Sequence, residues 1–250
     1  SFTEWDEKSK QIEYTEETPL LDKDGTLLAK GWARRNVFTY DRSLVKTGIM
    51  SRKEWDFYNI LVGEDMQILV SFANINIGGY VAAKLTNVKT GEIICDSSQY
   101  FLGANKHVPP AKGDVPNRYK DKIGKTEFDF DTRETERLLY YKGKYKGKPV
   151  EVKVQMDIPE GLENITTIFP FEGDNTKYFM TTSECLDFRE GIVKCFYTEC
   201  HRVCIVNYPC FRAVGFNSFC NHFKHRNCTQ SSYNTTGSYS IAYTLINTIL

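Results

Sequence analysis

Apolar and polar residues alternate with a period of two along much of the chain from residue 55 onwards. In residues 149–158, four apolar side chains (Val150, Val152, Val154 and Met156) alternate with charged and amide side chains. This alternation places successive side chains on opposite faces of a strand. We therefore expect residues 149–158 to form a β-strand with one buried face.

Several further segments are rich in residues that favour strands, and turn-forming residues separate them. The turns contain glycine with aspartate or asparagine, as in residues 22–25, 63–65 and 87–91. No segment shows a convincing amphipathic-helix pattern. The short turn spacing is typical of an antiparallel meander, so the pattern predicts an all-β barrel or sandwich. The other predicted strands are residues 26–29, 55–62, 66–76, 80–86, 92–95, 164–169 and 177–182.

Residues 102–124 break this pattern. They contain three glycines and three prolines but few apolar side chains, so we expect a long loop, a feature that is usually functional or disordered. His107 lies in it. A histidine here can serve as a general acid or base, or it can be an ordinary surface side chain.

The 250 residues suit one large all-β domain or two small ones. We expect an exposed lead-in over residues 1–18, a β domain over 19–190 and an ill-defined, divergent tail over 191–250. Seven of the eight cysteines lie between Cys185 and Cys228, and no Asp or Glu follows Glu199. The composition therefore changes near residue 190.

The tail places two cysteines and two histidines within nine residues: Cys220, His222, His225 and Cys228. Thiolate and imidazole groups are good zinc ligands, but this spacing is not that of a known zinc finger. Disulfides would need an oxidising compartment. The third interpretation is a tail without a site, and on it we predict no metal and no cofactor.

Charge and hydropathy limit the kinds of partner that the sequence predicts. Lys and Arg together number 32, as do Asp and Glu, so the formal net charge is zero. This balance argues against a dedicated nucleic-acid binder. No apolar run approaches the roughly 18 residues of a transmembrane helix. The polar first ten residues are not those of a signal peptide, so we expect a cytoplasmic protein. Nothing predicts an oligomeric state.

Residues 31–58 hold two of the three tryptophans and an unusual density of arginine beside aromatic residues. We predict that they bind the polar head group of a ligand at one end of the β domain, because arginine forms bidentate contacts with carboxylates and phosphates. In the alternative interpretation, these arginines stack on tryptophan and close a barrel end. The predicted binding residues are Trp32, Arg34, Arg35, Tyr40, Arg42, Trp55, Asp56 and Tyr58.

Separated motifs in one order carry a family resemblance. They are LLDKDG at residues 20–25, GWARR at 31–35, YDR at 40–42 and RKEWDFY at 52–58, followed by similar segments near residues 73–80, 163–171 and 177–179. Over residues 18–190 the chain resembles the bacterial domain-of-unknown-function family 2804. That family is similar to calycin-like proteins, including the carotenoid hydratase group. The resemblance implies a lipocalin-like barrel that encloses a hydrophobic ligand.

We therefore predict a protein that binds a hydrophobic or amphipathic small molecule and is not an enzyme. The first alternative is an enzyme that modifies a lipid or isoprenoid, as a hydratase does, which requires an acid facing the interior. Asp41, Asp56 and His107 are the candidate acids. The second alternative is a structural or interaction protein without a small ligand.

Overall fold

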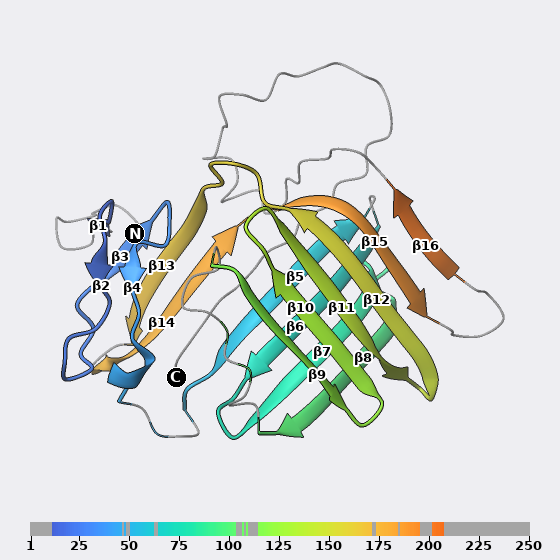
Figure 1. Cartoon of the computed structure of the whole chain (residues 1–250), viewed down its shortest axis with the longest axis horizontal. Coiled ribbons are helices and arrows are strands. Elements are labelled where there is room, and N and C mark those ends of the chain that lie inside the picture. The colour runs from blue at the N-terminus through green and yellow to red at the C-terminus, as the bar shows by residue number, and fades with distance from the viewer. Residues whose placement is uncertain are drawn as a thin grey trace, which may run out of the picture.

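The fold is built almost entirely of β-strands (Figure 1). This computed structural model describes residues 12–46, 48, 51–62, 65–103, 107, 109, 115–171, 174–184, 186–195 and 202–207, and none of these residues lies in an α-helix. A short 3₁₀ turn, η2, spans Arg42–Leu44. The predicted all-β class is confirmed. Within the same residues, no helix is long and apolar enough to cross a membrane.

The first large sheet is a four-stranded antiparallel meander in chain order. It consists of β5 (Glu54–Val62), β6 (Met66–Asn74), β7 (Gly78–Asn87) and β8 (Ile93–Leu102). Along β5, buried and half-buried residues alternate without interruption, which is the expected pattern of a strand with one face on a core. Residues 75–77 join β6 to β7, and the turn predicted at residues 87–91 leads from β7 to β8.

The second large sheet has six strands, and every neighbouring pair is antiparallel. In spatial order it contains β16 (Arg202–Asn207), β15 (Asp187–Cys195), β12 (Lys148–Asp157), β11 (Glu136–Tyr145), β10 (Thr126–Thr132) and β9 (Asn117–Ile123). The four apolar residues predicted to face one way on β12, Val150, Val152, Val154 and Met156, are all buried.

A smaller sheet lies to one side of the two large ones (Figure 1). It contains β1 (Ile12–Glu13), β3 (Gly31–Ala33), β13 (Asn164–Phe171) and β14 (Asp174–Glu184), while β2 (Thr18–Pro19) pairs with β4 (Phe38–Thr39). The chain thus leaves the six-stranded sheet after β12, builds the β13–β14 hairpin against N-terminal segments, and returns as β15. This path brings β14 close to residues from the start of the chain.

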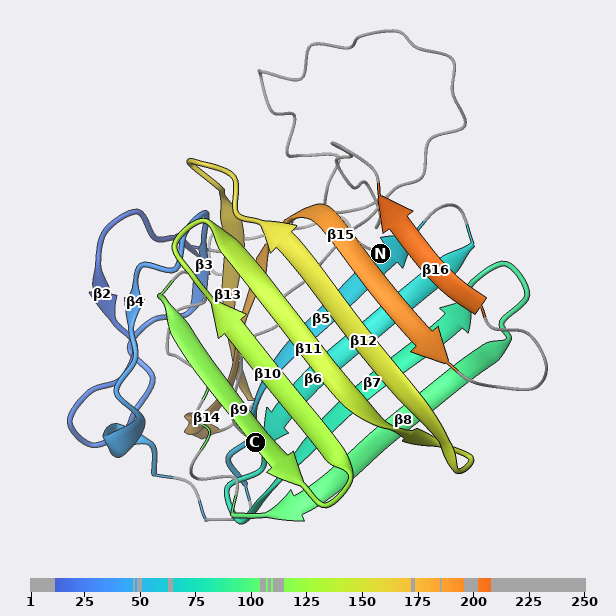
Figure 2. The same cartoon turned by 45° about the vertical axis from the view of Figure 1, so that its right-hand side comes forward.

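The main core lies between the two large sheets. Figure 2 shows the strands of one sheet crossing those of the other at an angle. Buried side chains from β5, β6, β7, β9, β10, β11 and β12 form one continuous cluster. The two sheets are not closed into one barrel over the described residues, so the sandwich is the predicted architecture that fits. A second, smaller core packs under β13 and β14.

Side chains join β8 to the opposite sheet at one corner. Ser97 Oγ lies 2.7 Å from the Tyr141 hydroxyl and donates to the Lys144 carbonyl at 2.9 Å. Gly143 sits at this contact, and a Cβ atom there would lie 2.5 Å from the Tyr141 hydroxyl and 2.7 Å from Ser97 Oγ. The close approach of the two sheets therefore requires a residue without a side chain at position 143.

One expectation from the sequence needs correction. The predicted loop over 102–124 contains β9. Tyr119 of this strand is buried, but the exposed side chains on the outer face are charged, so the hydrophobic pattern did not indicate a strand. Within the predicted lead-in, β1 is exposed and pairs with β3, and β2 begins at Thr18. The predicted boundary after residue 190 falls inside β15, and most of the predicted tail lies outside the described residues.

Candidate functional site

The inward face of β5 changes from apolar to acidic along the strand. Val62, Ile60 and Tyr58 are followed on that face by Asp56 and then Glu54. All five are buried. Burying an ionised carboxylate is costly unless hydrogen bonds or a countercharge compensate for it. The partners of these two carboxylates therefore define two polar clusters.

The first group, here called the Asp56 cluster, consists of Asp56, Tyr119, Arg137 and Glu184. These residues come from β5, β9, β11 and β14, and their exposed fractions lie between 1% and 6%. The Tyr119 hydroxyl donates a hydrogen bond to Asp56 Oδ2, and Arg137 Nη2 donates to Glu184 Oε1. The Arg137 guanidinium also lies over the ring of Tyr58, 5.9 Å from its centroid. The cluster thus joins both large sheets to β14.

The surroundings of Asp56 raise its pKa toward neutral pH. Burial raises the pKa of Asp56 to about 6, and the Glu184 carboxylate adds to the rise, while the Tyr119 hydrogen bond and Arg137 oppose it. Burial also raises the pKa of Tyr119, as does the Asp56 carboxylate. Tyr119 therefore keeps its proton and acts as a donor. Burial opposes the charge of Arg137, but the Glu184 carboxylate prevails and raises the Arg137 pKa, so Arg137 is cationic.

One buried oxygen atom of the Asp56 cluster lacks a hydrogen-bond partner among the described residues. This atom is Asp56 Oδ1. An unsatisfied buried acceptor costs roughly 1–3 kcal/mol, and more when it is charged. Carboxyl groups with a shifted pKa and an unused oxygen are concentrated at functional sites. Asp56 is therefore the strongest candidate for contact with a ligand or substrate.

Aromatic rings surround the cluster on its apolar side. The ring centroid of Phe72 lies 4.7 Å from that of Tyr119, 5.6 Å from that of Phe128 and 6.4 Å from that of Phe130. The Tyr58 ring meets Phe130 edge-on at 6.1 Å. These rings come from both large sheets and occupy the middle of the interior. The surroundings of Asp56 are therefore aromatic as well as dry.

The second group, here called the Glu54 cluster, consists of Glu54, Arg42 and Tyr40. The Tyr40 hydroxyl donates to Glu54 Oε1 at 3.1 Å, and Arg42 Nε donates to the same oxygen at 3.0 Å. Arg42 Nη2 also pairs with Glu54 Oε2, so the ion pair is bidentate. Burial raises the pKa of Tyr40, although Arg42 opposes this effect. Glu54 is therefore compensated, in contrast to Asp56.

The structure separates the eight predicted binding residues. Asp56 and Tyr58 face the interior, and Tyr40 and Arg42 form the neighbouring Glu54 cluster. The remaining four do not join them. Arg34 is exposed, forms an ion pair with Glu13 at 3.1 Å and lies over the Trp32 ring, 5.5 Å from its centroid. Arg35 is also exposed. The Trp55 ring packs on Phe179, with the ring centroids 6.0 Å apart.

The three candidate acids differ in environment. Asp41 is exposed, and hydrogen bonds from Ser43 lower its pKa. His107 is mostly buried, and its Nε2 lies 2.9 Å from Asp121 Oδ2. Its ring packs edge-on against Phe72 and Phe128, at 6.1 and 5.6 Å. Asp56 and His107 thus border the aromatic interior, whereas Asp41 does not.

A family model for Domain of unknown function (DUF2804) matches residues 11–201. The chain belongs to this family. No curated protein and no solved structure matches it. The motifs identified in the sequence indicated this family over residues 18–190. The DUF2804 match extends beyond that range at both ends and includes all of β15.

Three members of the Asp56 cluster escaped the sequence-based prediction for this DUF2804 chain. Arg137 shares the inward face of β11 with Leu139 and Tyr141. A charged residue at an inward position of an otherwise apolar face was the sequence signal that could have identified it. Glu184 likewise continues the inward face of β14 after Met180 and Thr182. Tyr119 lies in the segment predicted as a loop.

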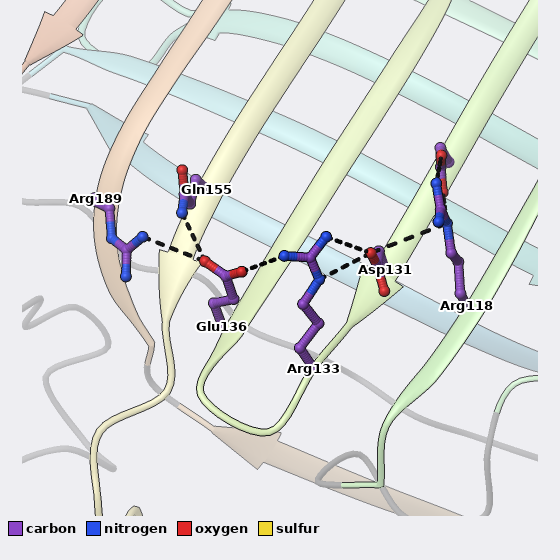
Figure 3. A network of polar contacts seen from close by, with 7 residues as sticks. Arg118, Asp131, Arg133, Glu136, Gln155 and Arg189 are labelled. Atoms are coloured by element: carbon purple, nitrogen blue, oxygen red, sulfur yellow. Dashed lines mark hydrogen bonds and ion pairs between the residues drawn. The ribbon is translucent and has the colours of Figure 1, made fainter.

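The outer face of the six-stranded sheet carries a ladder of alternating charges (Figure 3). Arg133 Nη1 lies 2.5 Å from Glu136 Oε1, while Gln155 donates to Glu136 Oε2 at 2.7 Å and Arg189 lies 3.3 Å from the same oxygen. Arg118 and Asp131 extend the row. Exposed ion pairs contribute little to stability. This face of the DUF2804 domain is therefore a solvated surface.

Metal ligands do not cluster in the described part of the DUF2804 chain, where no group of three or more suitable side chains occurs. The predicted cluster of Cys220, His222, His225 and Cys228 lies outside the described residues.

Proposed function

We propose that this DUF2804 chain binds an apolar or amphipathic small molecule between its two large sheets, with Asp56 as the polar anchor. The observation that carries the proposal is the buried Asp56 Oδ1, which has no hydrogen-bond partner among the described residues. A hydroxyl or amide group of a ligand would supply the missing donor. Tyr119 would hold the carboxyl group in place through Oδ2.

The aromatic interior supports an apolar ligand body. Phe72, Phe128 and Phe130 come from both sheets and present rings close to Tyr119 and Asp56. Because these rings pack on one another, a ligand enters by displacing them. Ring displacement changes the near-ultraviolet circular dichroism of the protein, which gives binding a second readout.

The test uses retinol, a fluorescent apolar alcohol, and its methyl ether, which lacks the hydroxyl donor. At pH 8 we expect saturable one-to-one binding of retinol and about ten-fold weaker binding to Asp56→Asn, because a hydrogen bond to a charged group is worth about 1.5–3 kcal/mol. The methyl ether should bind both proteins equally. The matched control is Asp96→Asn, an exposed carboxylate on β8 that lies 3.7 Å from Lys84. Failure of retinol to bind, or equal binding to wild type and Asp56→Asn, would contradict the proposal.

The second candidate function is the hydration of an isoprenoid double bond, and the pKa of Asp56 near 6 favours it. A protonated Asp56 would give its proton to one carbon of the double bond, and the aromatic rings would stabilise the cation. Water would add to the neighbouring carbon and return a proton to the Asp56 carboxylate.

Hydration has a direct test in which geraniol is incubated with the protein. We expect a product heavier by one water, which Asp56→Asn does not form and Asp96→Asn does. An inactive wild type would rule hydration out, and an active Asp56→Asn would rule out Asp56 as the proton donor. Neither result would affect the binding proposal.

We further propose that the protein is related to calycins and the carotenoid hydratase group, comes from a bacterium and is cytoplasmic. The support for these proposals is the motif order in residues 20–58 and the polar composition.

A further inference from the structure

A fully buried hydroxyl lies on β14, outside both clusters. Tyr178 has an exposed fraction of 0%, and its hydroxyl has no hydrogen-bond partner among the described residues. Burial raises the pKa of Tyr178 above its ordinary value, so the hydroxyl keeps its proton. It is a donor in need of an acceptor, because an unsatisfied buried polar group is costly.

Arg52 is a half-buried cation whose side-chain partner among the described residues is a neutral amide. Its Nη2 donates to Asn76 Oδ1 at 2.8 Å. No carboxylate of the described chain forms an ion pair with it. A guanidinium carries five N–H donors, so a single bond to an amide leaves most of its capacity unused.

These two residues lie beside the Glu54 cluster. The charge of Arg52 is close enough to act on Tyr178, Tyr40 and Arg42 alike. The adjacent contact between Trp55 and Phe179, at 6.0 Å, independently brings the start of β5 next to the middle of β14. Arg52, Arg42, Tyr40 and Tyr178 therefore surround one location at the acidic end of β5.

The charges at this location do not cancel. Arg42 and Arg52 contribute two positive charges, and Glu54 contributes one negative charge. Asp41 also acts on Tyr40, but it is exposed and bonded to Ser43. The partly buried groups thus carry one net positive charge and one idle hydroxyl donor. A monoanion with two oxygens complements both.

We infer that Arg52, Arg42, Tyr40 and Tyr178 bind the carboxylate of an amphipathic ligand whose apolar body runs along β5 toward Asp56. This inference rests on the proposed function, since the same ligand would occupy both places. Glu54 and Asp56 are two residues apart on one face, which corresponds to about 7 Å along a strand. A medium-chain or long-chain hydroxy fatty acid has the required chemistry: one carboxylate, an apolar chain and a chain hydroxyl that can donate to Asp56 Oδ1. A fatty acid without that hydroxyl tests the carboxylate site alone.

A carboxylate matches this location better than a phosphate monoester does. A phosphate monoester carries about 1.5 to 2 negative charges at neutral pH. Such a group would leave an excess negative charge beside Glu54. An alkyl phosphate of the same chain length should therefore bind more weakly than the carboxylate.

The test compares parinaric acid, a fluorescent fatty acid, with its methyl ester. Arg52→Gln removes the cation, and Tyr178→Phe removes only the idle hydroxyl. Arg35→Gln is the matched control, because Arg35 is an exposed arginine of the same region. We expect the acid to bind about ten-fold more weakly to Arg52→Gln and about three- to ten-fold more weakly to Tyr178→Phe. The ester should change less than two-fold in every variant.

The outcomes separate the two claims. If the ester binds and the acid binds equally well to wild type, Arg52→Gln and Tyr178→Phe, the carboxylate site is wrong while apolar binding stands. If neither probe binds wild type, both claims fail. Tighter binding of the alkyl phosphate would overturn the charge argument. Urea unfolding of each variant verifies folding, and Tyr178→Phe should fold, because it leaves no new buried polar group.

Discussion

Replacing Asp56 by asparagine tests whether this carboxyl group is as strongly perturbed as its surroundings imply. Asparagine keeps the shape of the side chain and an acceptor for the Tyr119 hydroxyl. It removes the ionisable group. The wild-type and variant proteins share all other titrating groups, including the carboxylates of Asp174, Glu127 and Glu136, whose pKa values are lowered. Their contributions therefore cancel in the difference between the two proteins.

The magnitude follows from the pKa of Asp56, which burial raises from 3.8 to about 6. The folded state holds this proton more tightly than the unfolded state. The resulting stabilisation is fully present below pH 3.8 and is lost as the pH rises through about 6. Each pKa unit corresponds to about 1.4 kcal/mol, so the loss amounts to about 3 kcal/mol.

The assay is urea unfolding followed by tryptophan fluorescence, from about pH 4 to about pH 8 at constant ionic strength. The unfolding free energy of Asp56→Asn minus that of wild type should rise by about 2.5 kcal/mol across this range, because a small part of the loss occurs below pH 4. In Tyr119→Phe the loss should move to higher pH, because the Tyr119 hydrogen bond lowers the Asp56 pKa. Asp96→Asn should show no such rise. A difference for Asp56→Asn that does not vary with pH would refute the assignment.

Three further changes test other parts of the structure by urea unfolding. Tyr178→Phe should stabilise the protein by about 1 kcal/mol, because it removes an unsatisfied buried hydroxyl; a loss would mean that the hydroxyl has a partner. Arg137→Met should destabilise it by about 3–5 kcal/mol by leaving Glu184 buried without its countercharge, and adding Glu184→Gln should restore part of that loss; equal losses in the single and double variants would contradict the pairing. Gly143→Ala should cost about 1–3 kcal/mol by forcing Tyr141 away from Ser97, and an unchanged stability would show that the two sheets can separate there.

Local alternation predicts the strands well where one face is apolar and the other polar. β12 follows it closely, and the all-β class comes from the same signal. In β5, by contrast, the buried face includes Glu54 and Asp56. β9 was missed because its inward positions include Asn117 and Asp121 beside Tyr119 and Ile123, and prolines and glycines precede it. A strand whose buried face is small leaves little trace in a hydrophobic pattern.

The site was harder to predict than the fold, because its residues are distant in sequence. Residues 31–58 do contain Asp56, Tyr58, Tyr40 and Arg42, but the arginines Arg34 and Arg35 of the same stretch are exposed. Arg137 and Glu184 are 47 residues apart. They meet because the β13–β14 hairpin leaves one sheet before β15 returns to it, and no local pattern encodes that path.

A crystal structure of the wild-type protein with parinaric acid tests the account most directly. We predict the carboxylate between Arg52 and the Tyr178 hydroxyl, and the apolar chain beside Asp56 and the rings of Phe72 and Phe128. Parinaric acid bound only on the outer faces of the sheets, with the interior rings unmoved, would contradict the account.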